Sequence, residues 1–339
     1  MFILSLLAMK LYRFFLAFFV RFRKQMQCIV SQPLPFLVLQ NAYLVAKIQI
    51  YPENKPKAIV QIVHGLDEHA GRYKELARKL TDNDFLVCAD DHRGFGRSAI
   101  TKEQMGDMGE NGHELIIEDL KYLMDKTKAE YGDLPYFMFG HSMGSFLTRG
   151  FLIKYHSYLN GAIVMGTKGK FKGFEKSGKI IANIQKAIFG GSKRARFLSK
   201  LANGGYGRKY FPEDNSSFAW MTSDKEEIKK VKEDEYFSKI PPSLETYIQI
   251  FHLLEKISNS KNYSNMNKDF PILLMSGDKD PVGNMGEGVK WVYEMYKSLG
   301  LTDINISLYK DGRHEILNDF CRQDVMNEIV EWLNRHIKN

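Results

Sequence analysis

The sequence predicts an α/β fold with a doubly wound, mostly parallel sheet. Short apolar runs typical of buried strands occur at 58–63, 85–89 and 161–165, and helix-length segments separate them. Gly-rich turns follow several of these runs. Strands that alternate with helices form βαβ units, in which the chemistry lies at the carboxyl ends of the strands. A chain of 339 residues has room for one such domain with an insertion, or for two domains.

The regular pattern begins at about residue 43. Residues 43–51 alternate between apolar and polar, which predicts a half-exposed strand. The elements expected after it are a strand at 58–63, a helix at 71–81, a strand at 85–89, a helix at 113–131, a strand at 136–139 with a helix behind it, and a strand at 161–165. These elements predict that residues 43–166 form the first part of the core.

Residues 167–268 interrupt this alternation. They are rich in Lys, have helical propensity, and contain no run typical of a buried strand. We interpret them as a helical cap, or lid, inserted over the strand ends. Residues 269–339 are predicted to complete the core, with a strand at 271–276, a helix at 285–299, a strand at 304–309 and a closing helix at about 322–338.

The net charge of +8 is unevenly distributed. Residues 168–210 hold twelve Lys or Arg and a single acid, Glu175, whereas residues 1–30 hold five basic residues and no acid. A local basic surface favours an anionic partner such as lipid headgroups; the alternative is a solvated face without a partner. A nucleic-acid partner is not expected, because no recognised binding module is present and the aromatic residues of the basic stretch form no stacking pattern.

Residues 1–30 form a basic, apolar N-terminal segment. On a helical wheel Lys10, Arg13, Arg21 and Lys24 share one stripe, and Phe, Leu and Ile fill most of the remainder. This pattern is typical of an amphipathic helix lying at a membrane surface. Two other interpretations stay open, namely a signal anchor and a sequence outside the folded domain.

Cysteine usage points to a reducing compartment. The three cysteines, Cys28, Cys88 and Cys321, are scattered and show no C-x-x-C spacing. This argues against a disulfide framework and against a zinc site. We therefore expect a cytoplasmic protein without a metal or cofactor, with peripheral membrane association if the N-terminal segment binds lipid.

A candidate nucleophile lies at the turn after residues 136–139. The apolar run stops at Gly140-His141-Ser142-Met143-Gly144. Two glycines at these positions suit a sharp turn in which strand and helix approach too closely for side chains. Such a turn exposes the Ser142 hydroxyl at a helix N-terminus, where unpaired N–H groups favour a developing negative charge. Because G-x-S-x-G also arises by chance, the assignment depends on partners elsewhere in the chain.

A serine hydroxyl becomes nucleophilic when a base takes its proton and a carboxylate orients that base. His314 follows the strand at 304–309, and both Asp278 and Asp280 follow the strand at 271–276. These loops give the chain order Ser, Asp, His. We predict His314 as the base and Asp280 as the acid, with Asp278 as the alternative. The other role open to Asp280 is capping of the next helix.

The oxyanion of the reaction needs backbone N–H donors. One is expected from Met143, the residue after the nucleophile, and the other from the loop after an early strand. The loop His64-Gly65-Leu66 follows the strand at 58–63, so Leu66 N–H is the predicted second donor. The alternative is that this loop is an ordinary tight turn.

Five segments together resemble the monoacylglycerol lipase and lysophospholipase group of α/β-hydrolases, also described as serine aminopeptidase-type. They are HGLDEHAGRY (64–73), DHRGFGRS (91–98), GHSMGS (140–145), GDKDPVG (277–283) and GRHEILN (312–318). The resemblance covers residues 43–339. It implies an α/β-hydrolase fold, the triad Ser142, Asp280 and His314, oxyanion donors at Leu66 and Met143, and a cap that admits an acyl chain.

The chain departs from this group in two places. Leu66 stands where a small residue is usual and Asp67 where the second Gly is usual, which would narrow the acyl entrance. Residues 1–42 do not resemble the start of the group. The first strand is therefore expected to be displaced, to be formed by Phe36–Gln40, or to be absent.

These observations favour a cofactor-free serine hydrolase that cleaves carboxylic esters through an acyl-enzyme. Monoacylglycerols or lysophospholipids are the expected substrates, because an apolar tunnel under a basic cap suits them. A general carboxylesterase acting on soluble or aryl esters is the alternative enzyme, since fold and triad do not name the substrate. A membrane-associated lipid-binding protein that has lost turnover is the alternative from another class.

Overall fold

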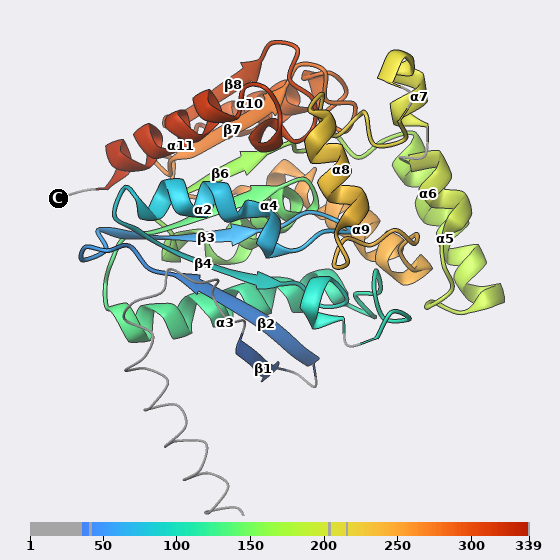
Figure 1. Ribbon diagram of the computed structural model, residues 1–339, viewed down its shortest axis with the longest axis horizontal. Coiled ribbons are helices and arrows are strands. Elements are labelled where there is room, and N and C mark those ends of the chain that lie inside the picture. Colours follow the sequence, from blue (N-terminus) through green and yellow to red (C-terminus); the bar gives the residue numbers. More distant parts are fainter. Residues whose placement is uncertain (1–35, 41–42, 100, 203–204, 215, 338–339) are drawn as a thin grey trace, which may run out of the picture. The chain divides into compact units, whose positions relative to one another are not determined.

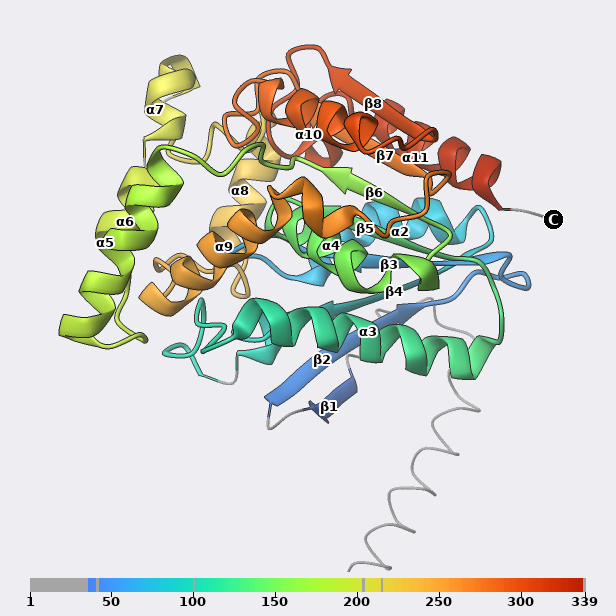
Figure 2. The ribbon, with the colours of Figure 1, turned by 180° about the vertical axis from the view of Figure 1, so that it is seen from behind.

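The computed structural model of the protein describes residues 36–40, 43–99, 101–202, 205–214 and 216–337. Within these residues the chain forms one eight-stranded sheet with helices on both faces (Figures 1 and 2). The predicted α/β class with a doubly wound, mostly parallel sheet is confirmed. The predicted N-terminal segment, residues 1–30, lies outside the described residues.

The strands follow the order β1-β2-β4-β3-β5-β6-β7-β8 across the sheet. β1 pairs antiparallel with β2 and β2 antiparallel with β4, whereas the six strands from β4 to β8 are parallel to one another. Of the three possibilities for the first strand, the structure contains the one formed by Phe36–Gln40. The strand bounds are β1 Phe36–Gln40, β2 Tyr43–Ile50, β3 Ala58–Val63, β4 Phe85–Asp91, β5 Tyr136–His141, β6 Gly161–Met165, β7 Ile272–Gly277 and β8 Ile304–Tyr309.

Two strands extend further toward the carboxyl edge of the sheet than their apolar runs predict. β5 continues to His141, which pairs with Met165 of β6, and β4 continues to Asp91, which pairs with Ala46 of β2. Strand pairing therefore extends beyond the apolar residues, because backbone hydrogen bonds do not require an apolar side chain. As a result, polar residues at this edge are held by the sheet itself.

Alternating side chains of the central strands fill two separate cores. Ile59 and Val63 of β3 belong to the cluster with helices α3 and α4, whereas Val60 and Ile62 belong to the cluster with α2 and α11. All six residues of β3 are buried, as expected for a strand covered on both faces. The helices of this part are α2 Lys74–Thr81 (preceded by a 3₁₀ turn at Ala70–Tyr73), α3 Gly112–Tyr131, α4 Met143–Tyr155, α10 Glu287–Ser298 and α11 Arg322–His336.

Between β6 and β7 the described residues form helices and no strand. These are α5 Phe174–Phe189, α6 Arg196–Ala202, α7 Tyr206–Tyr210, α8 Lys225–Glu233 and α9 Leu244–Ile257. Helix α9 starts where Ser243 accepts a hydrogen bond from Thr246 N–H, and its buried residues join the cluster of α4. In Figure 2, α9 lies next to α4, and α5 lies at the outer side of the insertion. No helix among the described residues is both long and apolar enough to cross a membrane.

Candidate active site

Ser142 lies at the turn between β5 and α4. Its backbone has φ 54° and ψ −123°, a conformation that a non-glycine residue adopts only under strain. The flanking glycines allow the turn: a Cβ at Gly140 would overlap Thr148, and a Cβ at Gly144 would overlap the carbonyl oxygens of Val63 and His64. Ser142 is partly exposed and lines a cavity of about 450 Å³. The turn thus presents the hydroxyl to a ligand-sized space.

His314 lies in the loop after β8 and lines the same cavity. Its Nδ1 is 2.9 Å from Oδ1 of Asp280, and both side chains are almost fully buried. The distance suits an ion pair between the two side chains. Asp280 also accepts a hydrogen bond from Val282 N–H (2.8 Å), which holds the carboxylate in place. Asp278 instead accepts from Asp311 N–H at the surface, so the structure brings Asp280 to His314 and not Asp278.

The buried pair shifts both pKa values in the direction that a catalytic pair requires. Burial opposes the charge on each group, but their mutual attraction outweighs it. The pKa of Asp280 is therefore lowered and the pKa of His314 raised from their ordinary values. Asp280 is thus ionised at neutral pH. With Nδ1 turned toward it, Nε2 of His314 is left to exchange a proton in the cavity.

This shift predicts the acid limb of the pH–rate profile. A general base must be neutral, so kcat/KM falls as the pH drops through the pKa of His314 in the free enzyme. Because Asp280 raises that pKa, we expect the midpoint of the limb to lie above the ordinary histidine value of 6.5. Measuring kcat/KM on a soluble p-nitrophenyl ester across the acid range checks this. A midpoint below 6.5 would contradict the coupling between His314 and Asp280.

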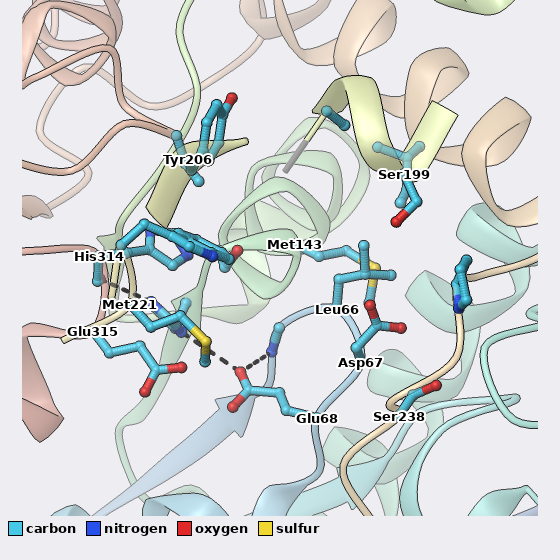
Figure 3. Close-up of a pocket in the computed structure, with 18 of the residues that line it drawn as sticks. Leu66, Asp67, Glu68, Met143, Ser199, Tyr206, Met221, Ser238, His314 and Glu315 are labelled. Atoms are coloured by element: carbon cyan, nitrogen blue, oxygen red, sulfur yellow. Dashed lines mark hydrogen bonds and ion pairs between the residues drawn. The ribbon is translucent and has the colours of Figure 1, made fainter. Parts of the chain in front are cut away.

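The loop after β3 lies against the nucleophile. Val63 of β3 is paired with Gly140 of β5, and a Cβ built on Gly65 would lie 3.1 Å from Cβ of Ser142. In the part of the chain that the structure describes, neither Leu66 N–H nor Met143 N–H donates a hydrogen bond. Both residues line the cavity (Figure 3). Two unpaired backbone donors beside a serine have the composition of an oxyanion hole.

A buried network connects this loop to the His314 loop. Oε1 of Glu68 accepts hydrogen bonds from Gly65 N–H and from the Tyr73 hydroxyl, both at 2.6 Å. Arg72 donates to Glu68 (2.9 Å) and binds both carboxylate oxygens of Glu315 (2.8 and 2.7 Å). Burial alone would raise the pKa of Glu68, but its contacts with His141 and Arg72 outweigh burial and hold the pKa well below its usual range.

His141 completes the connection. Its Nδ1 lies 3.0 Å from the Tyr73 hydroxyl, and its Nε2 lies 3.2 Å from the carbonyl oxygen of His314. Nδ1 also lies 3.5 Å from Oε1 of Glu68, so the ring links the His314 loop to Glu68. The sequence prediction missed this network. Its local signal was the i, i+4 spacing of Glu68 and Arg72, but no sequence pattern connects Glu68 to Glu315.

Residues from the insertion close the cavity over Ser142. The backbone N–H of His314 donates to the carbonyl of Trp220 (3.3 Å), and that of Glu315 donates to Met221 (2.7 Å). The Trp220 ring is tilted over the His314 ring at 5.1 Å. Side chains of α9, including Ile250 and Phe251, contribute apolar lining. The described residues contain no group of three or more His, Cys, Asp or Glu that could hold a metal ion.

The chain is similar to known proteins in sequence and in fold. The profile of the family described as serine aminopeptidase, S33, matches residues 54–320. A human monoglyceride lipase is 26% identical over 321 residues, covering 92% of this chain and 94% of that protein. A monoacylglycerol lipase of Mycolicibacterium smegmatis is 24% identical over 288 residues, covering 84% and 91%. Among solved structures, a thermostable carboxyl esterase of Bacillus coagulans, in complex with glycerol, is 31% identical with a TM-score of 0.82, covering 91% of this chain and 99% of that one.

Proposed function

Because the chain belongs to the serine aminopeptidase (S33) family and is an α/β-hydrolase of the monoacylglycerol lipase group, we propose that its substrates are monoacylglycerols or lysophospholipids and that Ser142 is its nucleophile. The observation that carries this proposal is the buried His314–Asp280 pair, whose histidine opens into the same cavity as Ser142. The residues predicted from sequence are thus assigned the roles of nucleophile (Ser142), base (His314), acid (Asp280) and oxyanion donors (Leu66 and Met143).

The reaction proceeds in two acyl transfers. Ser142 Oγ attacks the ester carbonyl carbon while His314 Nε2 takes the hydroxyl proton, and Asp280 stabilises the imidazolium that forms. The carbonyl oxygen becomes an oxyanion at the N–H groups of Leu66 and Met143, each of which contributes about 3 kcal/mol to the transition state. His314 then protonates the leaving alcohol. Water attacks the acyl-enzyme by the same steps and releases the acid.

The walls of the cavity support a substrate with an apolar acyl chain and a polar alcohol. Side chains of α4 and α9 provide the apolar wall, among them Phe146 and Leu254. Glu68, Arg72 and Glu315 also line the cavity, and Figure 3 shows Glu68 and Glu315 on the side of His314. The leaving alcohol lies on that side, because His314 donates the proton to it. Carboxylate oxygens there can accept hydrogen bonds from the hydroxyls of glycerol.

Substrate profiling tests this assignment. We expect kcat/KM to rise at least about tenfold from acetyl to medium-chain esters, because each buried methylene adds binding in an apolar pocket. We expect kcat/KM for medium-chain monoacylglycerols to exceed kcat/KM for p-nitrophenyl acetate. Hydrolysis of the monoacylglycerols should also depend on micelle formation. A preference for acetyl esters without micelle dependence would instead support the general carboxylesterase. Failure of a fluorophosphonate probe to label the wild-type protein would support the non-catalytic lipid-binding protein.

We further propose that the insertion contacts a lipid surface. On α5 the exposed residues Ile180, Ile184 and Ile188 are four positions apart and so share one face, and Phe197 and Leu201 of α6 are also exposed. The basic side chains exposed in this region are Lys170, Lys172, Lys176, Lys193, Arg196, Lys200, Arg208 and Lys209. Apolar residues flanked by lysines are typical of surfaces that bind anionic membranes. On this proposal the protein acts at the cytoplasmic surface of a membrane.

Replacing two of these isoleucines tests the lipid contact. We expect Ile184→Asp/Ile188→Asp to weaken binding to phosphatidylserine-containing vesicles at least about tenfold, because apolar burial and charge attraction are both reduced. Hydrolysis of soluble p-nitrophenyl butyrate should not change. Phe320→Asp is the matched control, since Phe320 is equally exposed but lies outside the insertion. Removing residues 1–30 in the same assay measures the contribution of the N-terminal segment; unchanged vesicle binding in both variants contradicts a membrane role.

A further inference from the structure

A second polar cluster lies in the cavity and takes no part in the proposed reaction. The cavity is lined by Asp67 in the loop after β3, by Tyr247 of α9 and by Ser199 of α6. The loop after β3 carries the proposed oxyanion donor Leu66 and is called the oxyanion loop below. Figure 3 shows Asp67 and Ser199 on one side of Leu66 and Met143, with His314 and Glu315 on the other side. Three elements that are distant in the sequence therefore supply polar groups to one wall.

This cluster holds a buried carboxyl oxygen without a hydrogen-bond partner. Within the described residues Oδ1 of Asp67 makes no hydrogen bond. The hydroxyl of Tyr247, which is only 4% exposed, has the Ser199 hydroxyl as its partner. Buried polar atoms in folded proteins nearly always have a hydrogen-bond partner. The pKa of Tyr247 is raised mainly by burial and further by the Asp67 carboxyl, which shows that the two groups lie near each other. A ligand hydroxyl beside Asp67 would supply the missing partner of Oδ1 and would lie near the Tyr247 hydroxyl.

The backbone at Asp67 is also unusual. Its φ is 64°, in the left-handed region that Gly adopts freely and Asp or Asn only with some strain. Glycine would suit the loop better if the carboxyl had no role. The loop instead carries an acidic residue at this position, and that residue lines the cavity. This makes a role for the carboxyl in ligand binding the natural interpretation.

The protonation state of Asp67 defines the chemistry of the ligand. Burial raises the pKa of Asp67 to about 8, with Glu68 adding to the shift and Arg194 opposing it. At neutral pH the carboxyl is therefore mostly protonated, so it can donate one hydrogen bond and accept another. The Tyr247 and Ser199 hydroxyls have the same dual capacity. A neutral hydroxyl group, which also donates and accepts, matches this set.

The position of the cluster decides which part of the substrate carries that hydroxyl. If Ser142 and His314 act as proposed, the leaving alcohol lies beside His314 and the acyl group lies on the opposite side of the oxyanion loop. Asp67 is on that opposite side (Figure 3). We propose that Asp67, Tyr247 and Ser199 form a subsite for a hydroxyl on the acyl chain, so that the preferred substrates are esters of hydroxylated fatty acids. This inference rests on the proposed esterase function.

Two series of esters test the subsite. In the first, the leaving group is always p-nitrophenol and the acyl group is octanoyl or octanoyl with a hydroxyl at successive carbons. In the second, the acyl group is always octanoyl and the alcohol is propanol or glycerol. We expect the best hydroxyoctanoate to exceed octanoate about tenfold in kcat/KM, as for a ligand group that satisfies an otherwise unpaired buried atom. Asp67→Gly and Tyr247→Phe should each reduce this ratio toward one and leave the glycerol-to-propanol ratio unchanged.

The controls separate the subsite from the fold and from catalysis. Glycine suits the backbone at position 67, so Asp67→Gly should keep the wild-type Tm. Ser238→Ala is the matched control, because this cavity serine already donates to Ile240 O (2.9 Å) and its loss should not change the acyl ratio. Binding of hydroxyoctanoic and octanoic acids to Ser142→Ala, measured by calorimetry, reports the subsite without turnover. The expected preference is again about tenfold.

Three outcomes would overturn the proposal. One is a wild-type preference for plain octanoate over every hydroxyoctanoate. Another is an effect of Asp67→Gly confined to the alcohol series, which would assign the cluster to the leaving group. The third is equal binding of the two acids by Ser142→Ala. A protein that hydrolyses no ester but still prefers the hydroxy acid would refute the proposed function and leave the hydroxyl subsite standing.

Discussion

Replacement of Ser142 by alanine should abolish turnover. We expect kcat to fall about 10⁶-fold, because removal of the nucleophile of a serine hydrolase leaves only substrate binding and the oxyanion donors to act on water. The same change should remove labelling by a fluorophosphonate probe. Stability should be preserved, since the hydroxyl of Ser142 makes no hydrogen bond to the described residues and the strain of the turn is in the backbone.

Ser217→Ala is the matched control for this experiment. Ser217 lines the same cavity but is exposed and lies far from the turn in sequence, so its loss should leave both turnover and labelling intact. Gel fluorescence after probe treatment, together with kcat on a medium-chain ester, measures the result. Residual labelling of Ser142→Ala would place the nucleophile elsewhere. A loss of labelling with full turnover would show that the probe reacts at a residue unrelated to catalysis.

Asp280→Asn has the second largest expected effect. We expect kcat to fall about 10⁴-fold, the loss seen when the orienting carboxylate of such a triad becomes an amide. The amide cannot stabilise the imidazolium, and it can hold the ring in the wrong tautomer. Because the Asp280 carboxylate raises the pKa of His314, its removal should also shift the acid limb of the pH–rate profile to lower pH.

The neighbouring carboxylate supplies the control. Asp278→Asn removes a surface carboxylate that accepts a hydrogen bond from Asp311 N–H and does not contact His314, so kcat should stay within about twofold of wild type. Both variants should be compared for Tm and for fluorophosphonate labelling rate. If Asp278→Asn loses more activity than Asp280→Asn, the acid has been assigned to the wrong residue.

Much of this arrangement could be predicted from the sequence because it is local. The alternation of apolar residues in β2, the buried runs of β3, β6 and β7, and the helix patterns between them depend on neighbours within a few positions. The turn at Ser142 was recognisable for the same reason, because its glycines stand where adjacent elements approach too closely for a Cβ atom. The carboxyl ends of parallel strands meet at one edge, so the loops holding Asp280 and His314 could be placed near Ser142.

The sequence by itself therefore determined the fold class, the strands whose loops carry the site and the set of candidate residues. Asp278 and Asp280 lie in one short loop, so the sequence could not separate them. Only the tertiary structure shows that Asp280, and not Asp278, contacts His314. It also revealed the Glu68–Arg72–Glu315 network and the unpaired carboxyl oxygen of Asp67 near Tyr247. These depend on contacts between residues up to 243 positions apart. The energy of a buried charge or hydrogen bond is set by its partners in space rather than by its neighbours in the chain.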